Sequence, residues 1–280
     1  MIRTERNGNR FYSGGIIPEG QQYPSVTTIL KATPKSEALI AWSAKVEREM
    51  VLEEAAHLYS LARRNKREIT PSTFLLRLVK RLGVEKAHSK ELRKAGQIGD
   101  QIHKLCEWSL RAELLEQVGP SPLIRDEAKW AYDQFLRWKQ SVALKPVLVE
   151  AFVACNCHRI AGTVDLVAEV NGELSVCDWK SGKYVYPESW LQAAAYRHCI
   201  ERMGLGQASK SIVLRLPKII GDPEFEAFEV PEPAEKLFEE FLNVKRVWEW
   251  FTNYKTMLDV QTEHQCQLTA SRRRLPWKVC

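Results

Sequence analysis

The stretch AGTVDLVAEVNGELSVCDWKSGK, residues 161–183, decides the fold that we predict for this chain. Two segments rich in valine and leucine flank Asn171-Gly172, a pair of residues that strongly predicts a two-residue β-hairpin turn. A turn of this length fixes the register of the two strands, so Val167 faces Val176. The stretch therefore predicts an antiparallel hairpin with a defined pairing.

The same register, continued away from the turn, places Asp165 directly opposite Asp178. Directly opposed residues project to one side of a hairpin with their Cβ atoms roughly 4.5–5.5 Å apart. Lys180 shares that face, because side chains alternate along a strand. Like charges in opposed positions destabilise a hairpin, and a divalent cation held between the two carboxylates would remove the conflict. The hairpin therefore predicts a metal site with a lysine beside it.

The length of 280 residues is enough for a sizeable core, as one elaborated domain or as one domain with a helical extension. A content of 45% hydrophobic and 27% charged residues is typical of soluble globular proteins. No apolar segment approaches the roughly 18 residues of a membrane span, and the N-terminus lacks the apolar core of a signal peptide. We expect a cytoplasmic protein, of a bacterium or a phage-infected cell, with no membrane partner. The acidic Glu5 disfavours a mitochondrial transit segment.

The net charge of +6 comes with basic residues that cluster at 63–67, 80–94 and 272–274. Such clusters suit a polyanionic partner, and they equally suit solvated helix faces. Charge alone leaves both interpretations open.

The seven cysteines include no C-x-x-C pair, and the odd number without a secretion signal indicates free thiols in a reducing compartment. Cys155-Asn156-Cys157-His158 is a local cluster that could form half of a zinc site. A matching second pair is missing from the sequence. The pattern therefore favours alternating residues at the end of a strand.

The rest of the chain predicts one mixed sheet with helices around it. Residues 1–30 are β-like and then rich in turns, with Ser25 as a helix cap. Apolar spacing predicts helices over 36–66, 70–83, 89–118, 122–142, 188–203 and 234–258, and strands after Pro146, at 211–216 and at 225–230. From about residue 89 to 217 the order α-β-β-β-α-β predicts a mixed central sheet flanked by helices.

We expect three parts in the chain. Residues 1–88 form a mostly helical N-terminal extension, residues 89–258 form the core, and residues 259–280 form a loosely held basic tail.

Four further polar side chains are candidates for the site at the hairpin. Glu150 lies on the preceding strand and could extend the acidic set, although no short turn fixes its face. Gln192 and Tyr196 share one helix face, where they could grip a phosphate or a lysine amine, or simply face solvent. His103 on a predicted helix is either a ligand or a structural histidine.

Taken together, these residues resemble the PD-(D/E)XK nuclease superfamily, in particular its RecB-like exonuclease branch. That pattern is a helical G-x-x-x-H, a strand glutamate, G-x-x-D, D-x-K and Q-x-x-x-Y, in this order. The corresponding residues here are Gly99 with His103, Glu150, Gly162-Thr163-Val164-Asp165, Asp178-Trp179-Lys180, and Gln192 with Tyr196. The match covers about residues 89–217. Residues 23–30 also look like the N-terminal segment of phage-type and mitochondrial-genome-maintenance-like members.

The resemblance implies a restriction-endonuclease-like αβββαβ core and a catalytic metal, Mg²⁺ with Mn²⁺ as the alternative. Its ligands would be Asp165, Asp178, His103, Glu150 and the main-chain carbonyl of Trp179. Lys180 would be the catalytic lysine, and Gln192 and Tyr196 would support it or the DNA phosphate.

Two features depart from the pattern. Asp100 follows Gly99, where a small residue such as threonine is common. Some relatives carry a four-cysteine iron–sulfur cluster. Only Cys266 and Cys280 follow the Q-x-x-x-Y helix, which argues against such a cluster here.

The resemblance implies a metal-dependent DNA exonuclease that prefers single-stranded ends, in replication, repair or recombination. Residues 1–88 would then cover a DNA channel, with Trp42 or Trp108 either stacking on bases or packed in the core. Three alternatives stay open: a structure-specific flap endonuclease with the same site, a catalytically inactive nucleic-acid-binding module, and an ordinary α/β protein whose hairpin carries a salt bridge. The sequence predicts no particular protein partner.

Overall fold

The computed structural model describes residues 1–34, 37–66, 69–116, 118–123, 125–222, 224–230 and 233–272, and side chains as far as residue 254. Its centre is a five-stranded sheet in the order β4 (Leu144–Cys155), β5 (Ile160–Val170), β6 (Glu173–Lys180), β7 (Lys210–Arg215) and β8 (Glu226–Glu229). Strands β6 and β7 are parallel, and the other neighbours are antiparallel. The prediction of a mixed central sheet is confirmed.

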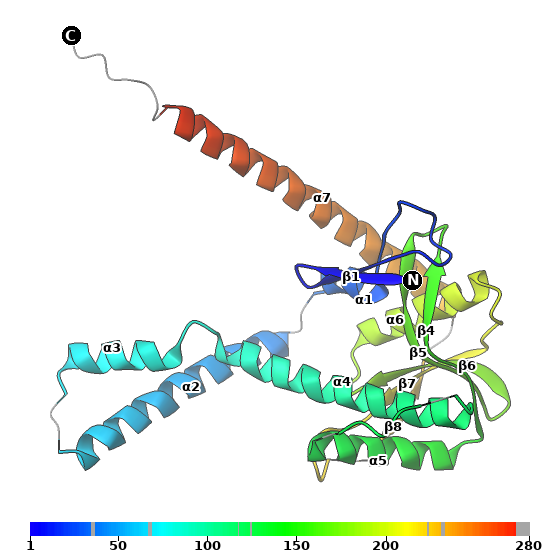
Figure 1. The fold of residues 1–280 in the computed structure, drawn as a ribbon, viewed down its shortest axis with the longest axis horizontal. Coiled ribbons are helices and arrows are strands. Elements are labelled where there is room, and N and C mark those ends of the chain that lie inside the picture. Colours follow the sequence, from blue (N-terminus) through cyan, green and yellow to red (C-terminus); the bar gives the residue numbers. More distant parts are fainter. Residues whose placement is uncertain are drawn as a thin grey trace.

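Helices cover both faces of this sheet (Figure 1). On one face, α4 (Ala87–Glu113) and α5 (Asp126–Ser141) pack against buried side chains of β5, β6 and β7. On the other face, α6 (Pro187–Arg202) and the first part of α7 (Ala234–Arg272) enclose a second apolar cluster. The chain thus has the predicted αβββαβ order within three layers. Among the described residues, no helix combines the length and apolar character that crossing a membrane requires.

The β5–β6 hairpin forms with the predicted register. Asn171 and Gly172 have φ angles of 52° and 86°, the left-handed geometry that a tight hairpin turn requires. Val167 pairs with Val176 as expected, and the pairing continues to Leu166 and Cys177 and ends there. The two strands therefore stop pairing at the level of the two aspartates.

The first residues form a small antiparallel sheet, with β1 (Ile2–Arg6), β2 (Asn9–Ser13) and β3 (Tyr23–Pro24) in that order. Ser25 caps the short helix α1 (Val26–Ile29), because its hydroxyl accepts a hydrogen bond from the Thr28 N–H. A 3₁₀ turn, η1 (Leu30–Ala32), follows. Ser25 also forms a parallel bridge with Ala161 at the start of β5. This bridge attaches the N-terminal sheet to the central sheet beside the hairpin.

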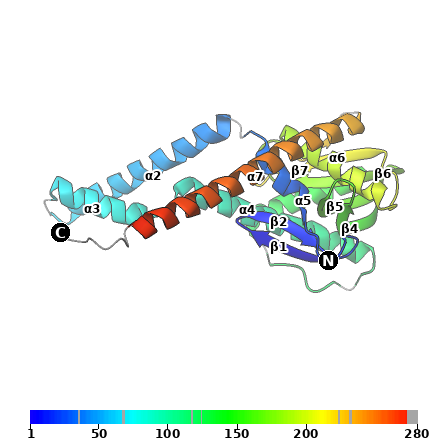
Figure 2. The same cartoon turned by 90° about the horizontal axis from the view of Figure 1, so that it is seen from above.

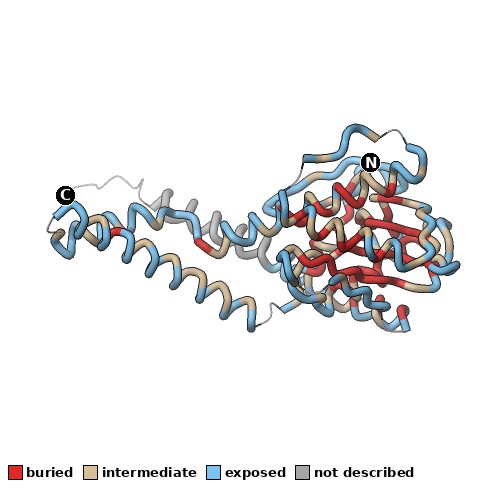
Figure 3. The backbone as a smooth tube through the Cα atoms, turned by 90° about the horizontal axis from the view of Figure 1, so that it is seen from below, coloured by how far each residue is buried: buried red, intermediate tan, exposed pale blue. Residues whose placement is uncertain are grey.

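Helices α2 (Glu37–Arg64) and α3 (Pro71–Leu82) form an arm that projects away from the core (Figures 1 and 2). The ends of α3 are the predicted ones, because Thr70 caps its start and Gly83, with φ 69°, follows its last residue. Figure 3 shows that the arm is mostly exposed, and Leu58 is the one residue of these two helices that is buried. The first 88 residues thus combine a β part on the core with a helical arm.

Some predicted boundaries were wrong. Helix α7 continues to Arg272, beyond the predicted end at residue 258, because no glycine or proline interrupts residues 234–272. Much of the expected basic tail is therefore helical, and residues 273–280 lie outside the described residues. Strand β4 starts at Leu144, before Pro146 and not after it, and its pairing shifts register between Pro146 and Leu148. A shift at this point is consistent with proline, which has no N–H to pair.

Candidate active site

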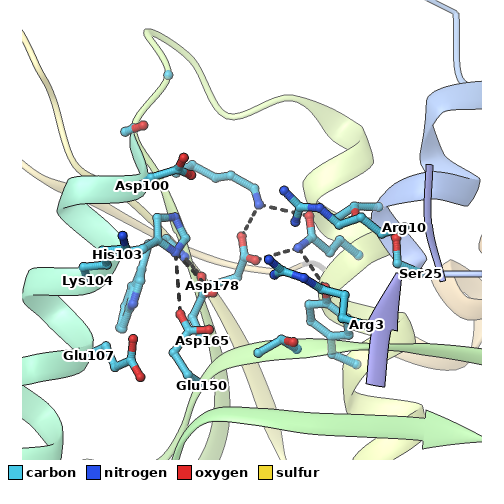
Figure 4. A pocket seen from close by; sticks show the side chains of 18 of the residues that line it. Arg3, Arg10, Ser25, Asp100, His103, Lys104, Glu107, Glu150, Asp165 and Asp178 are labelled. Atoms are coloured by element: carbon cyan, nitrogen blue, oxygen red, sulfur yellow. Dashed lines mark hydrogen bonds and ion pairs between the residues drawn. The ribbon is translucent and has the colours of Figure 1, made fainter. Parts of the chain in front are cut away.

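A cleft of about 650 Å³ opens where the β5–β6 pairing ends, between α4, α6 and the N-terminal sheet (Figure 4). We call it the active cleft. All the predicted site residues line it: His103, Glu150, Asp165, Asp178, Trp179, Lys180, Gln192 and Tyr196. The structure thus brings together side chains from α4, three strands and α6.

Three carboxylates lie at one level across β4, β5 and β6. Val149 pairs with Leu166 and Ala151 with Val164, so Glu150 lies opposite Asp165. Glu150 has φ 47°, a left-handed conformation that is uncommon for a residue with a side chain. This local twist interrupts the regular pairing of β4. The Glu150 side chain faces into the active cleft.

Asp165 occupies the gap that the end of the β5–β6 pairing leaves. Its Oδ2 accepts a hydrogen bond of 2.8 Å from the main-chain N–H of Trp179. The Trp179 side chain itself is buried against Phe135 and Trp138. Both ring pairs pack edge-on, with centroids 5.3 and 5.6 Å apart. Only the main chain of Trp179 is therefore available to the cleft.

His103 reaches the acids from α4. Its Nδ1 lies 3.3 Å from Oδ1 of Asp165 and 3.9 Å from Oε1 of Glu150. Burial lowers the pKa of His103, but the negative charges of Asp165, Glu150 and Asp178 outweigh burial and raise this pKa to about 10. Without a metal, the imidazole is therefore protonated at neutral pH.

Steric constraints explain why the two motif positions 99 and 162 are glycines. A Cβ at Gly99, one turn before His103, would lie 3.0 Å from Oγ of Ser181, so the glycine lets α4 approach the segment after β6. A Cβ at Gly162 would lie 2.6 Å from Cε1 of Tyr196. Gly162 therefore makes the space that Tyr196 occupies.

Lys180 is held by a chain of polar contacts. Its Nζ lies 2.5 Å from Oδ2 of Asp178 and donates to Oε1 of Gln192 at 2.9 Å. Nε2 of Gln192 donates to Oδ1 of Asp178 at 2.8 Å and to the Tyr196 hydroxyl at 3.4 Å. Gln192 thus bridges the lysine and the aspartate, which fits the supporting role that the motif implies.

The buried carboxylates of the cleft repel one another. Burial raises the pKa of Asp178 and Asp165 adds to the rise, while Lys180 opposes it, and the result is about 6. Burial also raises the pKa of Glu150. For Asp165, burial is outweighed by His103 and Lys180, so its pKa is lowered. An additional cation in the cleft would stabilise all three carboxylates.

The donor set fits a divalent cation. Single ligand atoms of His103, Glu150 and Asp165 lie within 4.8 Å of one another. Oδ2 of Asp178 is buried and, apart from its ion pair with Lys180, has no hydrogen-bond partner. Hard cations prefer carboxylate oxygens at such sites.

Two arginines of the N-terminal sheet also face the cleft, and the sequence did not predict them. Arg3 on β1 and Arg10 on β2 project toward the acids in Figure 4. They come close because the Ser25–Ala161 bridge docks this sheet beside β5. The resemblance of residues 23–30 to relatives was the one sequence signal that pointed to this region.

The two tryptophans considered for base stacking do not line the active cleft, and among the described residues neither α2 nor α3 contributes to it. The Nε1 of Trp108 donates to the Gly119 carbonyl at 2.8 Å. Trp42 lies on the arm, in α2. The part of residues 1–88 that meets the cleft is therefore the β1–β2 pair with the start of α1. The role of this extension as a DNA-channel cover stays a prediction.

Comparison with known proteins adds one decisive match. Residues 59–268 match the model of the PD-(D/E)XK nuclease superfamily. The chain belongs to this superfamily. PD-(D/E)XK nucleases act on nucleic acids with divalent metal ions, which agrees with the carboxylate and histidine donors of the active cleft.

Other comparisons are less informative. No curated protein matches this PD-(D/E)XK nuclease. Among 12 matching chains of solved structures is one titled "Crystal structure of SSO0001", with 14% sequence identity and a TM-score of 0.21. The match covers 52% of this chain and 74% of that chain. At that TM-score the likeness supports no conclusion about this nuclease.

Proposed function

We propose that this PD-(D/E)XK nuclease is a metal-dependent DNA exonuclease that hydrolyses phosphodiester bonds and prefers single-stranded ends. The observation that carries the proposal is the convergence of Asp165, Asp178 and Lys180 in one cleft, with His103 and Glu150 beside them. An inactive binding module would have no need of this complete set of acids with a lysine.

The residues that would hold the metal are Asp165, Asp178, His103, Glu150 and the Trp179 carbonyl. We propose Mg²⁺, because oxygen donors dominate this set, with Mn²⁺ as an alternative that accepts imidazole as well. When bound, the cation would neutralise charge on the phosphoryl oxygens and make a nearby water more acidic.

Lys180 has the position of a catalytic lysine in this proposal. Its ammonium group stands between Asp178 and Gln192, where it can orient a water or stabilise negative charge that develops on the phosphate. Gln192 fixes the direction of the ammonium group, and Tyr196 supports Gln192. These two residues would therefore position the lysine.

Arg3 and Arg10 supply the first contacts for the DNA backbone. A guanidinium group can bind two phosphate oxygens at once, and both arginines lie at the rim of the cleft on the side opposite His103. Such contacts bind any sequence, as a degrading enzyme requires. The net charge of +6 favours the same partner.

The preference for ends rests on the resemblance to RecB-like exonucleases. The N-terminal sheet beside the cleft is in a position to limit access to a single strand. We further propose that the enzyme works in DNA replication, repair or recombination, in the cytoplasm of a bacterium or a phage-infected cell.

One experiment tests the substrate and the reaction together. Single strands labelled at the 5′ or 3′ end, duplexes and closed single-stranded circles are incubated with the protein, with and without Mg²⁺. We expect linear single strands to be shortened from one end in the presence of Mg²⁺ and circles to stay intact. Cleavage of the circles would instead identify an endonuclease with the same site.

The variants Asp178→Ala and Lys180→Ala complete this test. Both should lose nearly all activity on every substrate, while Lys145→Ala, an exposed lysine on β4, serves as the matched control. Activity of Asp178→Ala or Lys180→Ala at the wild-type level would overturn the proposed site.

A further inference from the structure

A second group of metal-type donors lies away from the active cleft, at the turn between β4 and β5. Its members are Cys155, Cys157, His158 and His198. One ligand atom from each lies within 4.8 Å of all the others. Cys155 is buried, both histidines are half-buried and Cys157 is exposed. We call this group the thiol–imidazole cluster.

The fold assembles the cluster from two elements that are distant in sequence. Cys155 is the last residue of β4, and the chain then turns through residues 156–159 to enter β5. This turn carries Cys157 and His158 to the side of α6, where His198 lies. The β4–β5 turn supplies three of the donors locally, and α6 supplies the fourth.

The donors face one another at short range. The two Sγ atoms of Cys155 and Cys157 are 3.0 Å apart, and both cysteines are free thiols. The ring centroids of His158 and His198 are 5.2 Å apart. Ligands of a tetrahedral zinc ion are roughly 3.3–3.8 Å apart, given Zn–S and Zn–N bonds of about 2.3 and 2.0–2.1 Å. The cluster therefore needs only small side-chain movements to reach that geometry.

We propose that Cys155, Cys157, His158 and His198 form a tetrahedral Zn²⁺ site. Two thiolates and two imidazoles are a common ligand set of structural zinc, and they fill all four positions with protein atoms. Sulfur and nitrogen donors also separate this site from the oxygen donors of the active cleft, which suit a harder cation.

The surroundings of His198 support the proposal. Its Nε2 is buried and has no hydrogen-bond partner, which is costly unless a ligand is bound. The ring stacks on Phe238 of α7 with centroids 3.8 Å apart and an angle of 13°, so its orientation is held.

Two nearby basic residues are compatible with the ion. Arg202 and Lys245 interact electrostatically with His158, and their positive charges would repel an isolated dication. Two thiolates cancel the double charge of zinc, so the loaded cluster is neutral and no such repulsion remains.

The consequence of zinc at this place would be structural. The ion would tie the β4–β5 turn to α6, and α6 also carries Gln192 and Tyr196 of the active cleft. The two strands that this turn joins, β4 and β5, carry Glu150 and Asp165 of the active cleft. Zinc would therefore hold α6 in its place against the strands without touching the substrate.

Cobalt substitution tests the site directly. The reduced, metal-free full chain is titrated with Co²⁺, which in a tetrahedral site with thiolates gives strong visible bands and thiolate-to-cobalt charge transfer in the near ultraviolet. We expect one equivalent of Co²⁺ to produce these bands and Zn²⁺ to displace it. Co²⁺ in the active cleft cannot give thiolate charge transfer, so the readout is independent of nuclease activity and of the function proposed above.

Variants test whether the charge-transfer bands come from the thiol–imidazole cluster. Cys157→Ser, at an exposed position, and His198→Gln should lose the charge-transfer bands and weaken Zn²⁺ binding by more than about 10-fold, because even losing a group that only hydrogen-bonds a ligand costs 10- to 100-fold. Cys199→Ala is the matched control, since this buried thiol is the next residue on α6 but lies outside the cluster. It should keep the bands.

A second readout is thermal stability. Zinc at about 100 times its Kd should raise the Tm of the wild-type protein by about 5 °C, and a zinc-selective chelator should reverse the gain. The Tm of Cys157→Ser should not respond. The proposal is overturned if the wild-type protein shows no charge-transfer bands, if Cys157→Ser keeps them, or if Cys155 and Cys157 form a disulfide that binds no metal.

Discussion

The active cleft and the thiol–imidazole cluster lie on the same β4–β5 hairpin, but they offer different atoms to a cation. The cleft combines three carboxylates with one imidazole and keeps a lysine close by. The cluster has two thiols and two imidazoles, which would fill all four coordination positions of a tetrahedral ion. One site is thus suited to a cation that must also meet a substrate, and the other to an ion that holds two elements together.

The two sites also differ in how the chain constructs them. In the cleft, like charges are forced together by strand register, and burial with their repulsion raises the pKa of Asp178 to about 6. In the cluster, the β4–β5 turn and α6 bring two thiols and two imidazoles together without any carboxylate. The comparison teaches that strand register can place like charges together in a cleft, whereas a turn packed on a helix places thiols and imidazoles together. Several variants and pH titrations can break or sharpen this distinction.

The largest effect is expected from Lys180→Ala. Loss of the ammonium group should slow cleavage by about 10³-fold, similar to the loss of a strong transition-state donor. The variant should keep the cobalt bands of the thiol–imidazole cluster. Rates are measured as release of labelled nucleotides from single-stranded DNA. A loss smaller than about 10-fold would mean that Lys180 has no catalytic role.

The counterpart of this test is Cys157→Ser. If the cluster is only structural, cleavage at a temperature well below the Tm should fall by less than about 10-fold while zinc binding is lost. A loss as large as that of Lys180→Ala would contradict the division between a reactive and a structural site.

The second prediction concerns pH. The raised pKa of His103, about 10, means that a proton occupies this imidazole at pH 7 and has to leave before a metal can bind there. The affinity for Mn²⁺ should therefore rise by about tenfold per pH unit between pH 7 and 9, as one proton is displaced. The dependence should flatten in His103→Gln. Calorimetric titrations at several pH values measure it, and an equal slope in both proteins would exclude His103 as a ligand.

The same pKa predicts an effect on the stability of the metal-free protein. Because folding raises the pKa of His103, its ion pairs stabilise the folded state fully below pH 6.5 and lose that contribution as the pH rises toward 10. Denaturant unfolding of the metal-free protein between pH 7 and 10 should show a decrease that is smaller in His103→Gln. An identical decrease in the two proteins would contradict the assignment.

A third, smaller effect is expected at the rim of the cleft. Arg10→Ala should weaken the binding of single-stranded DNA several-fold and reduce the slope of log K against log salt by about 0.7, the value for one lost contact to a single-strand phosphate. Binding is measured by fluorescence anisotropy in the Lys180→Ala background, with Lys145→Ala as the control. An unchanged slope of log K against log salt would show that Arg10 does not contact the DNA backbone.

The smallest effect is expected from alanine substitutions at two glycines of α4, which should differ in stability and in cleavage rate. Apart from the adjoining residues and backbone of its own helix, no atom lies within 4 Å of the position that a Cβ would take at Gly96, so Gly96→Ala should stabilise the helix by about 0.5–1 kcal/mol. At Gly99 the new methyl group would lie 3.0 Å from the Ser181 hydroxyl, beside Lys180. Gly99→Ala should therefore gain less stability and also slow cleavage. Thermal unfolding and cleavage rates measure both effects, and equal gains with equal rates in the two variants would contradict the close contact.

The parts of the site that could be predicted are those governed by local rules. The Asn171-Gly172 turn determined the register of β5 and β6, and hence the common face of Asp165 and Asp178. Thr70 and Gly83 likewise marked both ends of α3 correctly.

The parts that escaped prediction depend on contacts between distant segments. Arg3 and Arg10 reach the cleft only because Ser25 bridges to Ala161, and His198 meets Cys155 only because α6 packs on the sheet. No propensity or spacing rule describes such docking. Glu150 has a positive φ angle, which is atypical for glutamate and has no sequence signal.

The central claim, that the active cleft is a metal-dependent catalytic centre, is tested most directly with Asp178→Asn. This change keeps the shape of the side chain but removes its charge. Mn²⁺ binding and cleavage of end-labelled single-stranded DNA are measured on the same samples of wild-type and variant protein. We predict that the wild-type protein binds the ion and degrades the DNA, and that Asp178→Asn loses both properties while its Tm is maintained. Cleavage by Asp178→Asn at the wild-type rate would contradict the claim.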